Sequence, residues 1–176
     1  MTIRATTIRV VLTLLAGGCG AMAQDAAKTA FDESKFPREV RASLRDAHEE
    51  CKREGGGKVT FAPDTVRALD LTGDGRDDYI VDFRDTACEG REAAYCGTGG
   101  CNLDILVALP GGKLRTVFSA RVRSYEILPG EGAKGGKGGK TIRFMLHGTY
   151  CGGHGNPSCP KEHTITAKPF VFREPK

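Results

Sequence analysis

The sequence predicts an α+β fold in which one N-terminal amphipathic helix packs on a mostly antiparallel β-sheet or small sandwich, stabilised by disulfide bonds. Three observations support this prediction. A run with a helical period, residues 36–53, comes first. Short runs with a period of two follow it along the rest of the chain. The 176 residues include seven Cys, and six of them lie within residues 51–159. One helix followed by a series of strands is typical of α+β domains.

Residues 1–23 have the layout of a secretory signal peptide. Arg4 and Arg9 precede an apolar run at residues 10–16, and residues 21–23 (Ala-Met-Ala) form a small-x-small cleavage site. The apolar run is shorter than the roughly 20 residues that span a membrane. We therefore expect a periplasmic or secreted protein without a transmembrane segment.

The same region also allows a bacterial lipoprotein signal at residues 15–19 (Leu-Ala-Gly-Gly-Cys). Cys19 would then become the lipidated first residue of an anchored protein. Ala16 is smaller than the aliphatic residue usual at its position in such signals. Cleavage after Ala23 is therefore favoured over lipid anchoring.

The composition of the remaining chain limits its partners. Removal of residues 1–23 takes away two Arg and no acid, so the formal net charge falls from +4 to +2. This weak charge, with acids interspersed among the basic residues, argues against nucleic acid and an anionic membrane surface as partners. Leu, Ile, Val and Phe make up about a fifth of residues 24–176, the lower limit for a self-sufficient core.

The expected helix lies at the start of the domain. Residues 24–35 are polar and Ala-rich, and we expect a flexible lead-in there, followed by a single domain at residues 36–176. Residues 55–57 (Gly-Gly-Gly) end the helix. Its apolar face consists of residues at intervals of three or four: Phe36, Val40, Leu44, Ala47 and Cys51.

The period-two runs predict strands in an antiparallel arrangement. Residues 121–125 and 141–145 alternate polar and apolar side chains, as half-buried antiparallel strands do. Residues 110–112 (Pro-Gly-Gly) mark a hairpin turn. The predicted strands are residues 58–62, 66–71, 79–83, 103–109, 113–118, 121–128, 141–146 and 164–172.

The Gly- and Lys-rich residues 130–140 do not match a phosphate-binding loop. Lys134 stands where that motif requires Gly, and a strand is expected to follow where the motif requires a helix. A hairpin loop is predicted there, and no nucleotide ligand.

Six Cys in the mature chain predict three disulfide bonds, because an even number of Cys in an exported protein is typical of a disulfide framework. Six Cys allow fifteen connectivities. Segments 96–101 and 151–159 each have a Cys at both ends and Gly between, so each can fold back on itself. Local pairing is therefore favoured. The pairs would be Cys96 with Cys101, Cys151 with Cys159, and Cys51 with Cys88.

The strongest chemical signal is the loop at residues 70–78, Asp-Leu-Thr-Gly-Asp-Gly-Arg-Asp-Asp. Oxygen-bearing side chains stand at its first, third, fifth and ninth positions, a Gly at the sixth turns the backbone, and the seventh supplies a carbonyl oxygen. Oxygen ligands at this spacing can converge on a hard cation, and calcium fits them. Val81 replaces the bidentate Glu of an EF-hand, so no helix-loop-helix sensor is predicted.

This loop resembles the Asp-x-Asn-Gly-Asp-Gly-x-x-Asp loop of the FG-GAP and VCBS repeats of integrin-type propellers and secreted bacterial proteins. The resemblance extends through residues 79–83 to the expected hairpin at residues 103–118. It implies a structural calcium ion at the entry to a strand and, with one copy of the loop, neither a propeller nor adhesion. The chain is also similar to a family of small exported proteobacterial proteins, which implies no particular activity. By the match to the FG-GAP and VCBS loops, the ligands are Asp70, Thr72, Asp74, Asp78 and the carbonyl of Arg76.

An alternative for residues 70–78 is an acidic, Gly-rich turn that is held by side-chain to backbone hydrogen bonds and binds no ion. A second group of candidate metal ligands lies near the C-terminus, but its spacing does not match a zinc site, and export favours oxidised Cys. We expect a disulfide loop there, with an exposed tip at residues 152–157 that could serve as a contact surface. The group comprises His147, Cys151, His154, Cys159 and His163.

The sequence contains neither a Gly-x-Ser-x-Gly nor a His-Glu-x-x-His motif. The favoured function is an exported, non-enzymatic module with a structural calcium loop that acts through macromolecular contacts at the cell envelope. One alternative is a periplasmic inhibitor of a lytic enzyme or protease, which predicts a protruding, rigid Gly-rich loop at residues 151–159. Another is a small hydrolase, which predicts a concave pocket with convergent acids from Asp82, Asp85 or Glu89.

Overall fold

A computed structural model describes residues 31–128, 138–153 and 157–175. The signal peptide, Cys19, most of the loop at residues 130–140, and His154 at the tip of the C-terminal disulfide loop lie outside the described residues. Part of the lead-in expected at residues 24–35 is described. Its last residues form the 3-10 helix η1 (Glu33–Lys35), and Phe31 stacks on Phe36.

One α-helix, α1 (Arg38–Arg53), precedes the strands. Its buried apolar residues lie three or four positions apart, which places them on one face. The strands are β1 (Val59–Thr60), β2 (Val66–Leu69), β3 (Asp78–Asp82), β4 (Ala87–Cys88), β5 (Cys96–Gly97), β6 (Gly100–Ala108), β7 (Leu114–Val122), β8 (Ser124–Ile127), β9 (Thr141–His147) and β10 (Ser158–Thr164), with the 3-10 helix η2 (Gly148–Cys151) between β9 and β10.

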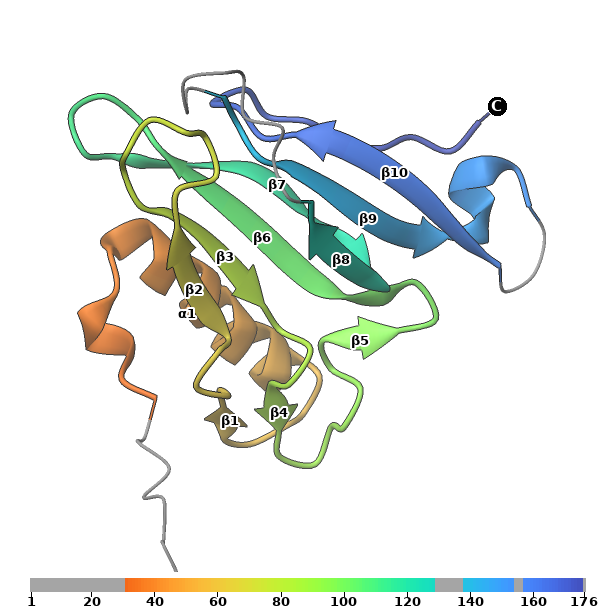
Figure 1. Ribbon diagram of the computed structural model, residues 1–176. Coiled ribbons are helices and arrows are strands. Elements are labelled where there is room, and N and C mark those ends of the chain that lie inside the picture. Colours follow the sequence, from red (N-terminus) through yellow and green to blue (C-terminus); the bar gives the residue numbers. More distant parts are fainter. Residues whose placement is uncertain (1–30, 129–137, 154–156, 176) are drawn as a thin grey trace, which may run out of the picture.

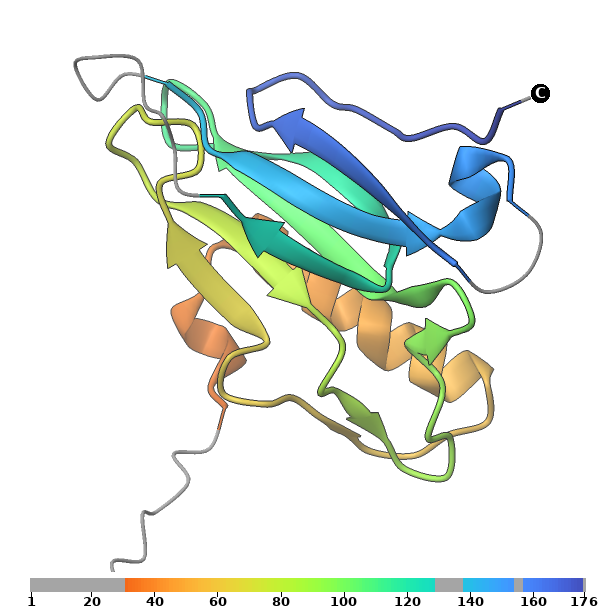
Figure 2. The same ribbon diagram turned by 45° about the vertical axis from the view of Figure 1, so that its right-hand side comes forward.

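The described elements form three layers. A central sheet has the order β2-β3-β6, with β7 on the other side of β6 and β5 paired to the start of β6. A second sheet, β10-β9-β8, covers one face of the central sheet, and α1 covers the other (Figures 1 and 2). All strand pairs in the described residues are antiparallel, including the short pair β1 and β4. The predicted α+β class, with mostly antiparallel sheets and disulfide bonds, is confirmed.

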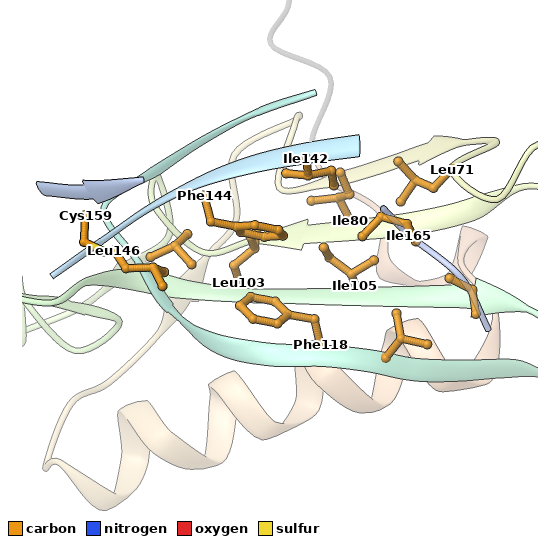
Figure 3. Close-up of a cluster of buried hydrophobic side chains, with 13 residues drawn as sticks. Leu71, Ile80, Leu103, Ile105, Phe118, Ile142, Phe144, Leu146, Cys159 and Ile165 are labelled. Carbon is orange, nitrogen blue, oxygen red and sulfur yellow. The ribbon is translucent and has the colours of Figure 1, made fainter. Parts of the chain in front are cut away.

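Two hydrophobic clusters separate these layers. Side chains alternate along a strand, so Ile80 of β3 points into one cluster and its neighbour Val81 into the other. The cluster between the two sheets is drawn in Figure 3, where Phe144 of β9 lies over Leu103 and Phe118 of the central sheet. The second cluster joins the buried face of α1 to the central sheet. Neither face of the central sheet is left to solvent as a whole, which is why apolar runs occur in β3 and β6.

Three disulfide bonds are present, and their pairs are those that the sequence favoured. Cys51 to Cys88 ties the last turn of α1 to β4, with 5.7 Å between the Cα atoms. The other two close local hairpins, Cys96 to Cys101 and Cys151 to Cys159. Because apolar residues are few for this chain length, covalent links offset part of the missing burial.

The C-terminal part of the chain differs from the predicted strands. The strand expected at residues 164–172 is wrong, since residues 165–175 have no regular secondary structure. The last strand is β10 instead, which begins inside the disulfide loop. The sequence did not indicate β10, because its residues are mostly polar and include Pro160. β10 can nevertheless be a strand, since it lies at the edge of its sheet, where Pro and an exposed side are tolerated. Pro169 interrupts the run that was expected to be a strand.

We call residues 165–175 the C-terminal strap. The backbone N–H of Phe170 donates to the carbonyl oxygen of Val117 in β7 at 2.9 Å. The ring of Phe170 packs against Phe118 and Phe144, with centroid distances of 4.9 and 6.0 Å, and stacks on His163 of β10 at 3.7 Å. The strap thus covers the side of the sandwich that is bounded by β7 and β10.

Candidate functional site

Residues 70–78 connect β2 to β3 and thus form the end of a hairpin. The carboxylate of Asp70 accepts hydrogen bonds from the backbone N–H groups of Gly73, Asp74 and Gly75, at 2.7, 3.2 and 2.8 Å. Burial acts to raise the pKa of Asp70, but these bonds and the nearby charge of Lys140 outweigh it, so the pKa lies below its ordinary value. Asp70 is therefore ionised at neutral pH and orders the loop around itself.

Asp78 occupies the opposite end of the loop and is 0 % exposed. Its Oδ2 accepts hydrogen bonds from the N–H groups of Leu71 and Thr72, both at 2.8 Å, and its Oδ1 accepts one from Ala108 of β6 at 2.7 Å. These three bonds satisfy a carboxylate that would otherwise be costly to bury. Asp78 therefore fastens the loop to β6.

The remaining predicted ligands lie between these two carboxylates. The hydroxyl of Thr72 is buried and has no hydrogen-bond partner in the described residues. Asp74 accepts hydrogen bonds from the backbone and the guanidinium of Arg76. No three Asp, Glu, His or Cys side chains within the described part of the chain are arranged as ligands of one metal ion. The predicted oxygen donors share one loop, but most of them are engaged with N–H groups.

The structure separates the predicted His and Cys group. Cys151 and Cys159 form a disulfide. His147 lies opposite Ser158 in the β9–β10 ladder, whereas His163 lies opposite Ile142 near the other end of the same ladder. The described residues of this group therefore do not converge on one point, as the ligands of a zinc ion would.

A polar cleft of about 400 Å³ lies between the two sheets. It is found where β2, the edge strand of the central sheet, faces β8, an edge strand of the second sheet. In both views of the molecule, β8 is the strand of the second sheet nearest to β3 (Figures 1 and 2). The charged and hydroxyl-bearing residues that line the cleft are Asp64, Arg67, Asp82, Arg84, Asp85, Ser124 and Tyr125.

Arg67 and Tyr125 face each other across this cleft. The guanidinium of Arg67 donates a hydrogen bond to the hydroxyl of Tyr125 and lies 5.4 Å from the centroid of its ring. Burial and the neighbouring carboxylate of Asp82 raise the pKa of Tyr125 to about 12, against the opposing effect of Arg67. The phenol is therefore protonated at neutral pH, and its hydroxyl accepts from Arg67 and donates to Asp82.

Asp82, the last residue of β3, and Arg84 also line the cleft. The Oδ1 of Asp82 accepts a hydrogen bond from the N–H of Arg84 at 3.0 Å, and its Oδ2 lies 3.7 Å from Arg84 Nε. Arg84 Nη1 also donates to the carbonyl oxygen of Arg123 at 2.8 Å, between β7 and β8. The bond to Arg123 links the end of β3 to the connection between β7 and β8, beside the cleft.

Of the acids proposed for a hydrolase, Asp82 and Asp85 line the cleft, but Glu89 does not. Glu89 lies beside β1 and accepts a hydrogen bond from the N–H of Lys58 at 3.2 Å. Sequence reasoning missed Arg67 and Tyr125, which are 58 residues apart. The signal available was weak: both side chains stand at outward or half-buried positions of period-two runs, where charge and hydroxyl groups are ordinary.

The hairpin loop and the cleft are parts of one unit. Arg67 lies opposite Ile80 in the β2–β3 ladder, and the loop joins the other end of the same two strands. β2 is a four-residue edge strand, so its position depends on β3 and on the loop that connects them. The bonds of Asp70 and Asp78 thus help to place Arg67 over the cleft.

A second polar pocket, of about 220 Å³, lies on the other face of the central sheet under α1. It contains Asp104 of β6 with Asp46 and Glu50 of α1. Burial raises the pKa of Asp104, hydrogen bonds from Ser119 and Ser43 oppose this effect, and Asp46 adds to it. The ionised form of Asp104 is therefore disfavoured in this pocket.

No helix within the described ranges has the length and hydropathy needed to cross a bilayer. Comparison of the chain with models of protein families, with curated proteins and with solved structures finds no match.

Proposed function

We propose that the chain is an exported, non-enzymatic binding module of the cell envelope whose contact site is the cleft between β2 and β8. The observation that carries the proposal is the pair formed by Arg67 and Tyr125. A guanidinium that lines a cleft and is held there by a phenol hydroxyl is a donor suited to an anionic group of a partner. Binding sites are commonly polar groups that converge in a concave surface.

The described residues of the cleft favour binding over catalysis. Its lining contains neither His nor Cys. The hydroxyl of Tyr125 keeps its proton at neutral pH, so it is a poor base or nucleophile. Ser124 has no base paired with it by a hydrogen bond in the described structure, and such a pair is what activates a Ser nucleophile.

Calcium is part of this proposal, with a structural role in the loop of residues 70–78. Two observations support it besides the likeness to FG-GAP and VCBS loops: the buried Thr72 hydroxyl lacks a partner among the described residues, and Asp70 is held ionised. The proposed ligands are Asp70, Thr72, Asp74, Asp78 and the carbonyl of Arg76. An ion there would compete with the N–H groups that now bind Asp70 and Asp78, which agrees with the weak affinity expected of extracellular sites.

A small hydrolase is the second candidate, because Asp82 and Asp85 both line the cleft. The inhibitor alternative rests on the loop closed by Cys151 and Cys159, of which residues 154–156 lie outside the described part of the chain. The two alternatives place the contact in different parts of the molecule, so one experiment separates them.

The test uses a photo-cross-linker, p-benzoylphenylalanine, at one of three exposed positions. Position 124 lies in the cleft, position 157 in the disulfide loop, and position 171 in the strap, where Val171 is 66 % exposed. Irradiation in an envelope fraction of the native host should give a discrete adduct from position 124 that Arg67→Met removes. An adduct from position 157 alone would favour the inhibitor, and the absence of any adduct from position 124 would refute the cleft as the contact site.

A further inference from the structure

The cleft contains a cation whose bonding capacity is largely unused. A guanidinium has five N–H donors, and Arg67 gives one hydrogen bond, to a neutral hydroxyl. Among the described residues no carboxylate lies within ion-pair distance of Arg67. Arg84 differs, because it is bonded to Asp82 and to the carbonyl of Arg123. Arg67 is thus the cation of this cleft that is available to a ligand.

The cleft also contains two available carboxylates. Asp64 and Asp85 line it with Arg67. Neither carboxylate has a hydrogen bond or an ion pair to another group in the described structure. Both residues are exposed, so their charge faces the solvent of the cleft. The third acid, Asp82, already has partners, because Arg84 Nε lies 3.7 Å from its Oδ2 and the hydroxyl of Tyr125 bonds to it.

A free cation and two free carboxylates in one cleft restrict the charge of a ligand. A dianion would meet the carboxylates of Asp64 and Asp85, and a dication would meet Arg67; like charges brought together in this way oppose binding. A molecule that carries one negative and one positive group meets an opposite charge on both sides. Charge complementarity of this kind selects among partners more than it raises affinity.

We propose that the cleft binds a zwitterion of the amino-acid class, with its carboxylate on Arg67 and its ammonium toward Asp64 and Asp85. The inference rests on the proposed function, because it assigns a ligand to the same cleft. The hydroxyl of Tyr125 accepts a hydrogen bond from Arg67 and gives its one proton to Asp82, so it holds the guanidinium in the cleft and leaves the other four N–H donors of Arg67 for the carboxylate of the ligand. The source is either a free amino acid or a short free peptide with both of its ends, and a volume of about 400 Å³ admits both.

The edges of the two sheets favour a peptide over a free amino acid. β2 and β8 are both edge strands in the described sheets, and the cleft lies between them. An edge strand offers backbone N–H and C=O groups that an extended peptide can bind, as in strand addition. The amide of a dipeptide would therefore find partners that a free amino acid lacks.

Calorimetric titration of the oxidised mature protein tests the ligand class. The probes are free alanine, Ala-Ala, N-acetyl-Ala-Ala and Ala-Ala amide, so that each blocked dipeptide lacks one charge. Ala-Ala should bind about tenfold or more tightly than either blocked form, since loss of one charge-assisted contact has this order of effect. Tighter binding of Ala-Ala than of alanine identifies a short free peptide as the source, and equal binding identifies an amino acid; both results support a zwitterion.

Variants assign each charge to its residue. In Arg67→Met the amide should bind as well as Ala-Ala, because the carboxylate has lost its partner. In the double variant Asp64→Asn, Asp85→Asn the acetylated dipeptide should match Ala-Ala. Arg41→Met, on the exposed side of α1, is the control and should leave the order of probes unchanged. Equal affinity of the wild type for all three dipeptides, or no binding of any probe, would overturn the inference.

The two proposals fail separately. If the adduct from position 124 forms but no probe binds, the cleft remains the contact site and the ligand class is wrong. If Ala-Ala binds as expected but the adduct is absent, the zwitterion stands and the macromolecular contact does not.

Discussion

Two acids of this protein, the buried Asp78 and the half-buried Asp104, show how surroundings decide the effect of a carboxylate. Asp78 is fully enclosed, yet three backbone N–H groups bind its two oxygens. Asp104 lies among Ser hydroxyls and next to Asp46, and burial raises its pKa. The first carboxylate organises a loop, whereas the second is poorly stabilised when ionised. The sequence singled out Asp78 through its spacing, but nothing in the sequence distinguishes Asp104 from a surface acid.

We predict that Asp104→Asn stabilises the protein at pH 7. A raised pKa means that the folded state prefers the protonated acid. Stability is therefore lost as the pH rises from the ordinary value of 3.8 through the folded-state pKa. Asn removes this loss, and the melting temperature should rise by about 2–4 °C, which corresponds to about 1 kcal/mol in a domain of this size.

Thermal unfolding followed by circular dichroism at pH 4 and pH 7 measures the effect of Asp104→Asn. The gain over the wild type should shrink at pH 4, where more of the wild-type acid is protonated. Asp64→Asn, at an exposed position, should leave the melting temperature nearly unchanged. A gain of equal size at both pH values would show that ionisation of Asp104 is not its cause.

At the scale of the element, the β2–β3 hairpin joins the proposed ion loop to the proposed contact site. Its existence follows from the period-two runs on both sides of residues 70–78. Its connection to the cleft does not, because five strands, β3 to β7, separate Arg67 from Tyr125 along the chain, and Tyr125 lies in β8 of the second sheet. The period and spacing of residues indicate the structure of one element and its turn, whereas a cleft between two sheets is formed by segments that are distant in the sequence.

We predict that calcium raises the melting temperature of the wild-type protein and that Asp74→Ala abolishes this rise. With a dissociation constant of about 0.1 mM, 1 mM calcium would add about 1.4 kcal/mol, or a few degrees. Magnesium should substitute poorly, because it resists a site made mostly of protein oxygens. The measurement compares melting in EDTA with melting in calcium, with the three disulfides intact. Identical melting in both, with no calorimetric signal, would identify residues 70–78 as an acidic turn without an ion.

At the scale of the whole molecule, one side of the sandwich is covered by a chain segment and the other carries a cleft. The C-terminal strap and its aromatic rings cover the side of β7 and β10. The opposite side, between β2 and β8, carries the polar cleft. The layers and the disulfide pairs could be anticipated from period, composition and Cys spacing. The strap could not, because its apolar residues alternate like those of a strand and only the structure shows that they pack from outside the sheets.

We predict that Phe170→Ala destabilises the protein by about 2 kcal/mol. Phe170 is half-buried, so the loss should be smaller than the roughly 3–5 kcal/mol of a fully buried Phe. Urea denaturation monitored by fluorescence of the Tyr residues gives the free energy of unfolding. The neighbouring change Val171→Ala, at a residue that is 66 % exposed, should cost less than about 0.5 kcal/mol. Equal effects of the two changes would show that the strap contributes little to the core.

The order of the six paired Cys has a consequence for how the chain matures. Each disulfide joins a Cys to the next one along the chain: 51 to 88, 96 to 101, and 151 to 159. During N-to-C translocation across a membrane, the first thiol of each pair would meet its native partner before any later thiol emerges. An oxidase that acts on thiols as they appear would thus form the native bonds directly, and we expect maturation to proceed without a disulfide isomerase.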